Sequence, residues 1–303
     1  MRVLGCKNKM RKYVTMILFL TIVQFSFGQN TILWQVTDTI NNKISTIIGT
    51  YHQFGNSFVD SIPEIKQHLY NSELAIFESI DSGNETIKAI NNRVESLEIK
   101  KRIKKKDYLR LMELSETWKV DIHKLKPIEL RWKLEQEFVK TKCKTVLKND
   151  KWDHFDNYLI HLAEKENIEI LGLETGQEQL NFINKANNFP NWKDERKRIS
   201  YLLDQFNRTD FNKNRCALAT KYRTYDLDYK LNEECKTDVL LKERNDNWMK
   251  ILPQILKEKK CFIAVGLFHL YNTCGLLEQL KEEGFLIEPI ELKPQAPGPL
   301  QKK

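Results

Sequence analysis

Residues 47–79 read IIGTYHQFGNSFVDSIPEIKQHLYNSELAIFES, and this stretch decides the fold. It opens with an apolar, β-branched run that ends in Gly49-Thr50-Tyr51-His52. A helix is expected next, because Ser61 and Glu64 have the spacing of a capping box. The apolar run LAIF then predicts a buried strand, and Glu78 follows it directly. The stretch is therefore a strand–loop–helix–strand unit.

Residues 261–290 repeat this pattern near the other end of the chain. The apolar run CFIAVG ends in Gly266-Leu267-Phe268-His269, a helix is expected to end at Gly284, and a last short strand follows. A Gly at the end of a strand permits a tight turn, and the His three residues later is presented at the carboxyl edge of the sheet. Two Gly-x-x-His motifs in the same context predict two related halves of one sheet.

The remaining segments predict a mixed fold of the α/β (α+β) class. Two apolar runs, at 32–36 and 44–48, are typical of a hairpin. A further short strand at 168–173 is followed by Glu174. We therefore expect duplicated strand–Gly-x-x-His–helix–strand halves that form a central sheet. A large helical insert, at about 85–166, is expected between them.

The N-terminus predicts an export signal over residues 1–28. A basic segment precedes an apolar run of 14 residues, which is shorter than the ~18–20 residues that span a membrane. Ser26 and Gly28 are the small residues that a signal peptidase requires, so cleavage is expected before Gln29. After cleavage we expect no stable membrane insertion, and an exported chain, either periplasmic or secreted.

The mature chain is expected to form a single domain over residues 29–292. Residues 293–303 contain three prolines and are expected to be a disordered tail. The whole sequence carries 49 basic and 41 acidic residues, but five of the basic residues and no acid lie in the signal. The mature chain thus has 44 basic residues against 41 acidic ones, a net charge of +3, which gives no reason to expect a nucleic acid as a partner. The oligomeric state stays open.

Five cysteines lie outside the signal, at positions 143, 216, 235, 261 and 274. An exported chain permits disulfides, although their connectivity does not follow from sequence. Cys216 and Cys235 lie close together and flank a polar stretch, so they are the first pair to consider. Cys261 opens an apolar strand and is expected to be a buried small hydrophobe.

Four polar side chains stand directly after predicted strands: His52, Glu78, Glu174 and His269. In open α/β sheets, ligands bind at the carboxyl ends of the strands, so four parallel neighbours would turn these side chains toward one pocket. Each residue alone is more often a hydrogen-bonded loop residue or a helix cap. Their shared position favours a site.

Two imidazoles with one or two carboxylates suit Mn²⁺, Co²⁺ or Zn²⁺ with an open position for water. Such an ion lowers the pKa of its bound water and polarises a carbonyl, and a nearby carboxylate, Glu78 or Glu174, can take the proton. His154 and His161, seven residues apart on one predicted helix, lack the strand-end position. We expect a surface or core role for both of them.

The two Gly-x-x-His blocks resemble the opening and closing blocks of the TraB/PrgY/GumN family, which includes the Tiki proteases. Between them, GLETGQEQ at 172–179 is similar to the family's Leu-Glu-Thr segment, and Glu243-Arg244-Asn245 resembles its Arg-Asn helix start. The four blocks occur in the family's order and span residues 47–285. Tyr51 and Phe268 place aromatic residues at the variable positions of the motifs.

For the Tiki branch, the resemblance implies a divalent-metal-dependent protease. By motif position, His52, Glu78 and His269 would be both its metal ligands and its catalytic residues. Glu174, Arg244 and Asn245 would lie beside the pocket, for charge balance or for contact with a substrate carbonyl. Other members of the family are described only as peptide-pheromone inhibitors or as products of polysaccharide gene clusters, so family membership alone does not imply peptidase activity.

The sequence therefore predicts an exported metal-dependent hydrolase, most simply a metallopeptidase that acts on a peptide or protein substrate. Two alternatives stay open. One is a non-catalytic protein that sequesters a short peptide or small ligand in the same cleft. The other is a metal-free hydrolase related to erythromycin esterases, which use a comparable His/Glu cleft.

Overall fold

The computed structural model describes residues 31–81, 84–186, 191–235 and 239–293. The predicted signal lies outside these residues, and so does the predicted tail from residue 294 on. Within the described ranges, no helix combines the length and the apolar character needed to cross a membrane.

A six-stranded mixed sheet forms the base of the fold, in the order β4-β3-β5-β2-β1-β6. Neighbours among β4, β3, β5 and β2 run parallel, whereas β1 pairs antiparallel with both β2 and β6. The predicted class is therefore confirmed. The strands are β1 (Leu33–Asp38), β2 (Lys43–Thr50), β3 (Leu74–Phe77), β4 (Glu169–Gly172), β5 (Cys261–Gly266) and β6 (Leu286–Pro289).

The four parallel strands are the ones that precede the predicted site residues, so their carboxyl ends lie at one edge of the sheet. Thr50 of β2 pairs with Gly266 of β5. Phe77 of β3 pairs with Ala264 on one side and with Gly172 on the other. Strands β3 and β5 are buried along their whole length, as expected for parallel strands covered on both faces.

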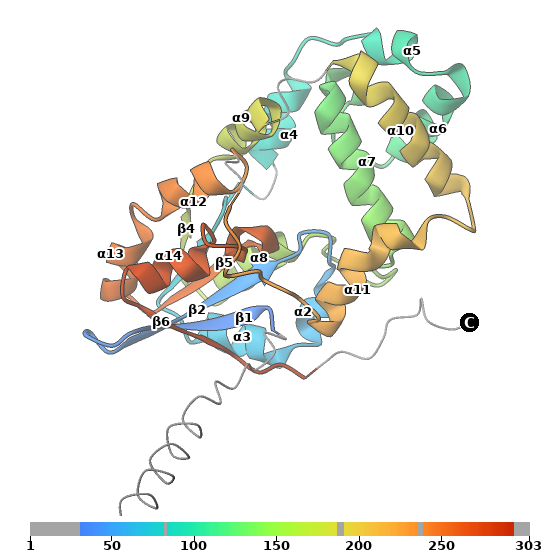
Figure 1. The fold of residues 1–303 in the computed structure, drawn as a ribbon. Helices are drawn as coiled ribbons and strands as arrows, with labels where there is room; N and C mark the ends of the chain where they lie inside the picture. The colour runs from blue at the N-terminus through green and yellow to red at the C-terminus, as the bar shows by residue number, and fades with distance from the viewer. Residues whose placement is uncertain (1–30, 82–83, 187–190, 236–238, 294–303) are drawn as a thin grey trace, which may run out of the picture.

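Helices cover both faces of this sheet. In Figure 1, α12, α13 and α14 lie over one face and α3 lies against the other. Helix α8 packs against β3 and β4. The bounds of these elements are α2 (Asn56–Asp60), α3 (Pro63–Tyr70), α8 (Phe155–Lys165), α12 (Lys242–Trp248), α13 (Leu252–Glu258), the 3₁₀-helix η3 (Leu267–Leu270) and α14 (Leu276–Glu282).

The capping box predicted for α3 is wrong. Its N-cap residue is Ile62, which makes no side-chain cap, because the short helix α2 precedes it and uses Ser61 as its own C-cap residue. The Ser61 hydroxyl donates back to the Phe58 carbonyl of α2. The predicted stop of α14 is confirmed, since Gly284 has φ +90°, a conformation that favours glycine.

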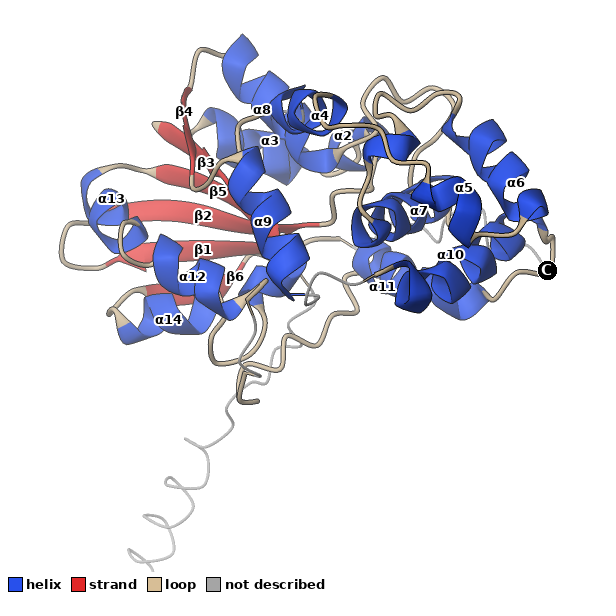
Figure 2. Cartoon of the chain, turned by 90° about the horizontal axis from the view of Figure 1, so that it is seen from above, coloured by secondary structure: helices blue, strands red, loops and turns tan. Residues whose placement is uncertain are grey.

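A second group of helices has α5, α6, α7 and α10 to the side of the sheet in Figure 2, and α4 and α9 join it through contacts of α9 with α4 and α7. We call α4, α5, α6, α7, α9 and α10 the helical body. It has its own apolar cluster, which includes Ile90, Leu111, Leu130, Leu180 and Ile199. The bounds are α4 (Asn84–Asn91), α5 (Glu98–Arg102), α6 (Lys105–Ser115), η1 (Ile122–Lys124), α7 (Pro127–Lys142), α9 (Gly176–Ala186), α10 (Trp192–Asn207), η2 (Lys213–Cys216) and α11 (Ala217–Thr224).

The helical body draws on sequence from both sides of β4, because α9 and α10 follow that strand. Helix α8 lies within the range expected to be insert, but its Phe155 and Leu159 belong to the apolar cluster of the sheet. This helix therefore carries its side chains to the sheet rather than to the helical body.

Two disulfides connect the loops around this framework. Cys143 at the end of α7 bonds Cys216 of η2, and Cys235 bonds Cys274 after η3. The predicted Cys216–Cys235 pair is wrong, because closeness in sequence does not bring two Cβ atoms into bonding range. Among the described cysteines, Cys261 is free and buried, as predicted.

Candidate functional site

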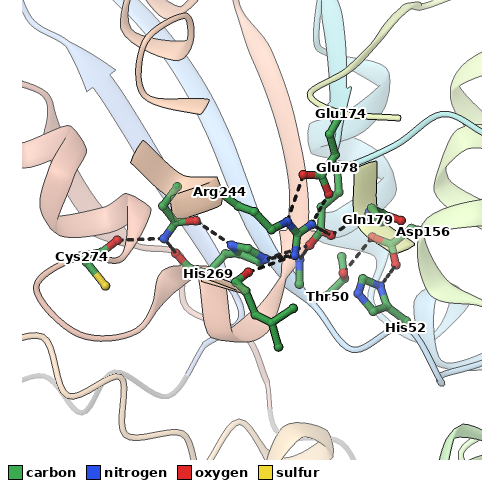
Figure 3. A network of polar contacts seen from close by, with 12 residues as sticks. Thr50, His52, Glu78, Asp156, Glu174, Gln179, Arg244, His269 and Cys274 are labelled. Carbon is green, nitrogen blue, oxygen red and sulfur yellow. Dashed lines mark hydrogen bonds and ion pairs between the residues drawn. The ribbon is translucent and has the colours of Figure 1, made fainter. Parts of the chain in front are cut away.

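Arg244 of α12 lies at the centre of the site, where it joins three of the predicted residues (Figure 3). Its Nη2 donates to Glu78 Oε2 at 2.6 Å and its Nε donates to Glu174 Oε2 at 3.0 Å. Its Nη1 donates to His269 Nε2 at 2.9 Å. The guanidinium also packs over the ring of Trp248.

Every N–H group of this guanidinium has an acceptor. The remaining two reach the Leu240 carbonyl at 3.2 Å and the second oxygen of Glu174. An Arg has five such donors and all five are used. A contact between Arg244 and a substrate, as predicted from the sequence, would require one of these hydrogen bonds to open.

Glu78 lies at the end of β3 and accepts hydrogen bonds on both oxygens. Oε1 accepts from the Gly266 backbone N–H at 2.5 Å and lies 3.6 Å from His269 Nε2, while Oε2 also accepts from Gln179 at 3.3 Å. Burial by itself would raise the pKa of Glu78, but the positive charges around it, those of Arg244 and His52 among them, together with the Gly266 N–H, outweigh burial and hold that pKa well below its usual range. Glu78 is therefore ionised.

His269 is held between Arg244 and Asn245, one on each ring nitrogen. Because Arg244 can only donate, His269 Nε2 accepts, and Nδ1 carries the proton that it donates to Asn245 Oδ1 at 2.6 Å. The amide of Asn245 donates in turn to the carbonyls of His269 and Cys274. Burial lowers the pKa of His269 to about 3, so the ring is neutral. Asn245 thus fixes the orientation of an imidazole.

His52 leaves the end of β2 and pairs with an acid that the sequence did not single out. Its Nδ1 lies 2.5 Å from Asp156 Oδ2, and the other oxygen of Asp156 accepts from the Thr50 hydroxyl at 2.8 Å. Burial would lower the pKa of His52, but the carboxylates of Asp156 and Glu78 raise it to about 9. The pocket around His52 therefore favours positive charge.

Gly266 makes the approach of His52 and Glu78 possible. A Cβ atom at this position would lie 2.9 Å from Glu78 Oε1 and 3.2 Å from His52 Nε2. The second Gly-x-x-His motif thus has two roles: Gly266 leaves room for His52 and Glu78, and His269 provides an imidazole.

His154 adds a second imidazole next to His52. It is the N-cap of α8, and its ring stacks on that of His52 with centroids 5.2 Å apart. The expectation of a surface or core role for His154 is wrong, because it lines the cleft. His161 stacks on Trp152 instead. The only signal in the sequence was a His-x-Asp pair at a helix start, which is too common to indicate a site.

His52, His154 and Asp156 form a group that could hold a metal ion. Their ligand atoms all lie within 4.8 Å of one another, and no other group of three or more His, Cys, Asp or Glu among the described residues does so. Two imidazoles and one carboxylate suit a divalent ion of intermediate softness, such as Zn²⁺, Mn²⁺ or Co²⁺. This group shares His52 alone with the predicted set of His52, Glu78 and His269.

The site opens into a cavity of about 820 Å³ between the edge of the sheet and the helical body. His52, Glu78 and His269 line one wall, and Trp132 and Ile183 of the helical body line the other. A cavity of this size takes a small molecule or a short peptide. All six residues predicted from the sequence lie at or directly behind this wall, although Glu174 and Asn245 do not line the cavity.

Comparison with known proteins places this arrangement in a family. The model of the TraB/PrgY/gumN family matches residues 32–289, from the first strand to the last. No curated protein matched the chain. The matched segment contains the complete sheet, the helical body and every residue of the site, and the chain therefore belongs to the TraB/PrgY/gumN family.

Proposed function

We propose that this chain is an exported, metal-dependent hydrolase that cleaves peptide bonds in the cleft. The observation that carries the proposal is the group of His52, His154 and Asp156, which lies beside the ionised Glu78 at the wall of a peptide-sized cavity. Family membership supports a hydrolytic or a ligand-binding role for the same cleft.

Two sets of residues could hold the ion, and both contain His52. The first is His52 with Glu78 and His269, from the motifs, in which His269 Nε2 would have to exchange the Arg244 N–H for the ion. The second is His52 with His154 and Asp156, from the geometry. A divalent ion held there would lower the pKa of a bound water and polarise the scissile carbonyl. Arg244 holds Glu78 and His269 in place by direct hydrogen bonds, and Asn245 orients His269 from behind.

Metal analysis of the purified mature chain tests the proposal. We expect near one equivalent of metal in the wild type and none in His52→Ala. His154→Ala and His269→Ala separate the two ligand sets, because each removes a ligand from one set only. His161→Ala is the matched control, since His161 stacks on Trp152 and does not line the cavity.

Turnover of a peptide library is measured on the same samples. Chelation should abolish turnover, and Mn²⁺, Co²⁺ or Zn²⁺ should restore it. A wild-type protein with no metal and no turnover would contradict the proposal and favour a protein that sequesters its ligand.

One observation favours a metal-free hydrolase as the second candidate. The series Thr50–Asp156–His52 fixes an imidazole through a buried carboxylate, as the acid of a Ser-His-Asp triad does. This candidate predicts turnover that survives chelation and falls in Asp156→Asn.

A further inference from the structure

Two arginines line the cavity, and they differ in their partners. Arg244 has an acceptor for each N–H group, as described above. Arg215 of η2 has none among the described residues, and its Nε is buried without a hydrogen-bond partner. No carboxylate of the described residues forms an ion pair with it. A buried donor without an acceptor is costly, and such groups in native proteins are usually satisfied by water or a ligand.

The aromatic rings beside Arg215 hold its charge without using its donors. The guanidinium carbon lies 5.2 Å from the ring centre of Phe138 in α7 and 5.7 Å from that of Tyr201 in α10. Contacts of this kind stabilise a cation without a hydrogen bond. The N–H groups of Arg215 therefore stay available for an acceptor supplied by a ligand.

The Cys143–Cys216 disulfide fixes Arg215 in this position. Cys216 follows it directly, and Cys143 is the C-cap residue of α7, the helix that carries Phe138. The backbone that presents the guanidinium is therefore covalently joined to the helix that supports it. A cation restrained in this way loses little conformational entropy when it binds a ligand.

We propose that Arg215 is the anchor for a carboxylate of the substrate. This inference rests on the proposed function, because it names the class of peptide that the cleft takes. A carboxylate matches the planar fork of an arginine with two parallel hydrogen bonds. The cavity is also lined by Glu135, Asp81 and Glu78, so a group with one negative charge fits a single unpaired cation better than a doubly charged phosphate does.

The geometry of the two walls gives the ligand its direction. Arg215 belongs to the segment between the helical body and α11, whereas His52 and Glu78 lie at the edge of the sheet. A short peptide anchored at Arg215 would run between them past Phe138 and Leu218, which line the same cavity. The carboxylate comes either from the C-terminus of the peptide or from an acidic side chain near it.

Three probe peptides separate these two sources: acetylated Phe-Ala-Ala with a free C-terminal carboxylate, the same peptide as its amide, and amidated Phe-Ala-Glu. Binding to the full mature chain is measured by calorimetry for peptides that stay intact, and kcat and KM are measured for peptides that are cleaved. We expect at least one of the two charged peptides to bind about 10- to 100-fold more tightly than the neutral one.

In Arg215→Gln, this preference should disappear, with Kd or KM raised about 10- to 100-fold for the charged peptide and kcat unchanged. Arg215→Lys should restore part of it, because lysine keeps the charge but lacks the fork. Arg223→Gln is the matched control, because Arg223 also packs over an aromatic ring, that of Phe54, but does not line the cavity.

The subsite and the proposed hydrolysis fail in different ways. Charge-dependent binding that needs Arg215 but leads to no turnover would support the subsite and contradict the hydrolase. A wild type that binds the neutral peptide as tightly as both charged ones would overturn the subsite. So would an Arg215→Gln protein that keeps the wild-type preference while its unfolding transition is unchanged.

Discussion

Gly266 has no room for a side chain, and this makes it a sharp test of the site at the scale of one residue. In Gly266→Ala, the new methyl group would push against Glu78 Oε1 and His52 Nε2, which would lie 2.9 and 3.2 Å away. We expect turnover to fall by at least ~10-fold, since displacement by a fraction of an ångström misaligns catalytic groups. Initial rates on a cleaved peptide measure the effect.

Gly49→Ala is the matched variant in the other motif. Its Cβ atom would meet Leu270 Cδ1 at 2.9 Å and the Leu267 backbone at 3.3 Å, which are parts of the core. We expect this variant to lose about 1–3 kcal/mol of unfolding free energy through overpacking. If Gly266→Ala were equally destabilised, its loss of activity would no longer report on the site.

Arg244 is expected to stabilise the fold as well as the site. In Arg244→Gln, Glu78 and Glu174 would stay buried without their cation, which typically costs about 3–5 kcal/mol. Their side chains are 8 and 5% exposed, so water compensates little. Urea unfolding measures the loss, and the double variant Arg244→Gln/Glu174→Gln should recover part of it. If Arg244→Gln were as stable as the wild type, the ion pairs of Arg244 with Glu78 and Glu174 would contribute nothing to the stability of the fold.

The residues predicted from the sequence were found through local signals. Each one directly follows a strand or lies within a recognisable motif. His52, Glu78 and His269 could be predicted in this way, because strand ends have a fixed place in a parallel sheet. His154 and Asp156 could not, since they come from the start of a helix in a long helical region. Arg215 gave no signal, because an arginine without a partner is visible only in three dimensions.

At the scale of the elements, Glu129 connects the helical body and makes its stability depend on pH. It lies in the first turn of α7, and it accepts hydrogen bonds from Arg93, from Asn184 of α9 and from the Lys126 backbone. Burial would raise the pKa of Glu129, but these donors lower it below its ordinary value of 4.5. Its contribution is therefore complete above about pH 4.5 and is lost as the pH falls through the lowered value.

We expect the unfolding free energy of the wild type to fall below pH 4.5 more steeply than that of Glu129→Gln, which has no carboxylate to protonate. Thermal unfolding measured between pH 3 and 7 checks this difference. Parallel acid limbs for the two proteins would show that Glu129 binds protons equally in the folded and unfolded states.

The two disulfides are expected to raise the free energy of unfolding. The Cys143–Cys216 disulfide closes a loop across 73 residues. We expect the Cys143→Ser/Cys216→Ser variant, in which this loop is open, to lose about 2–4 kcal/mol of unfolding free energy. Peptide mapping of the oxidised wild type should recover the pairs 143–216 and 235–274. A linked peptide that contains both Cys216 and Cys235 would contradict the structure.

The strands were predicted well because their signal is local. The runs that became β2, β3 and β5 are short, apolar and followed by polar residues. Other features depend on sequence outside the local pattern. Ile62, and not Ser61, is the N-cap residue of α3, because another helix precedes it. Cys216 forms its disulfide with a cysteine 73 residues away. The place of α8 against the sheet, rather than with the helical body, likewise depends on packing that no local pattern records.

At the scale of the whole molecule, export is a prediction about the chain before and after processing. The mature protein is expected to begin at Gln29, after loss of a segment with five basic residues and no acid. Intact mass and N-terminal sequencing of the protein recovered from outside the cytoplasm check this prediction. Recovery of the full-length chain from the cytoplasm would contradict it.

The two disulfides also restrain both walls of the cleft. One fixes the wall that carries Arg215, and the other holds Cys274, whose carbonyl receives the amide that orients His269. A reducing compartment keeps such thiols apart. A chain newly made there would lack both restraints, and its two walls would gain their final alignment only after oxidation. For a chain exported as proposed, synthesis and competence for the proposed activity would thus be separated in time.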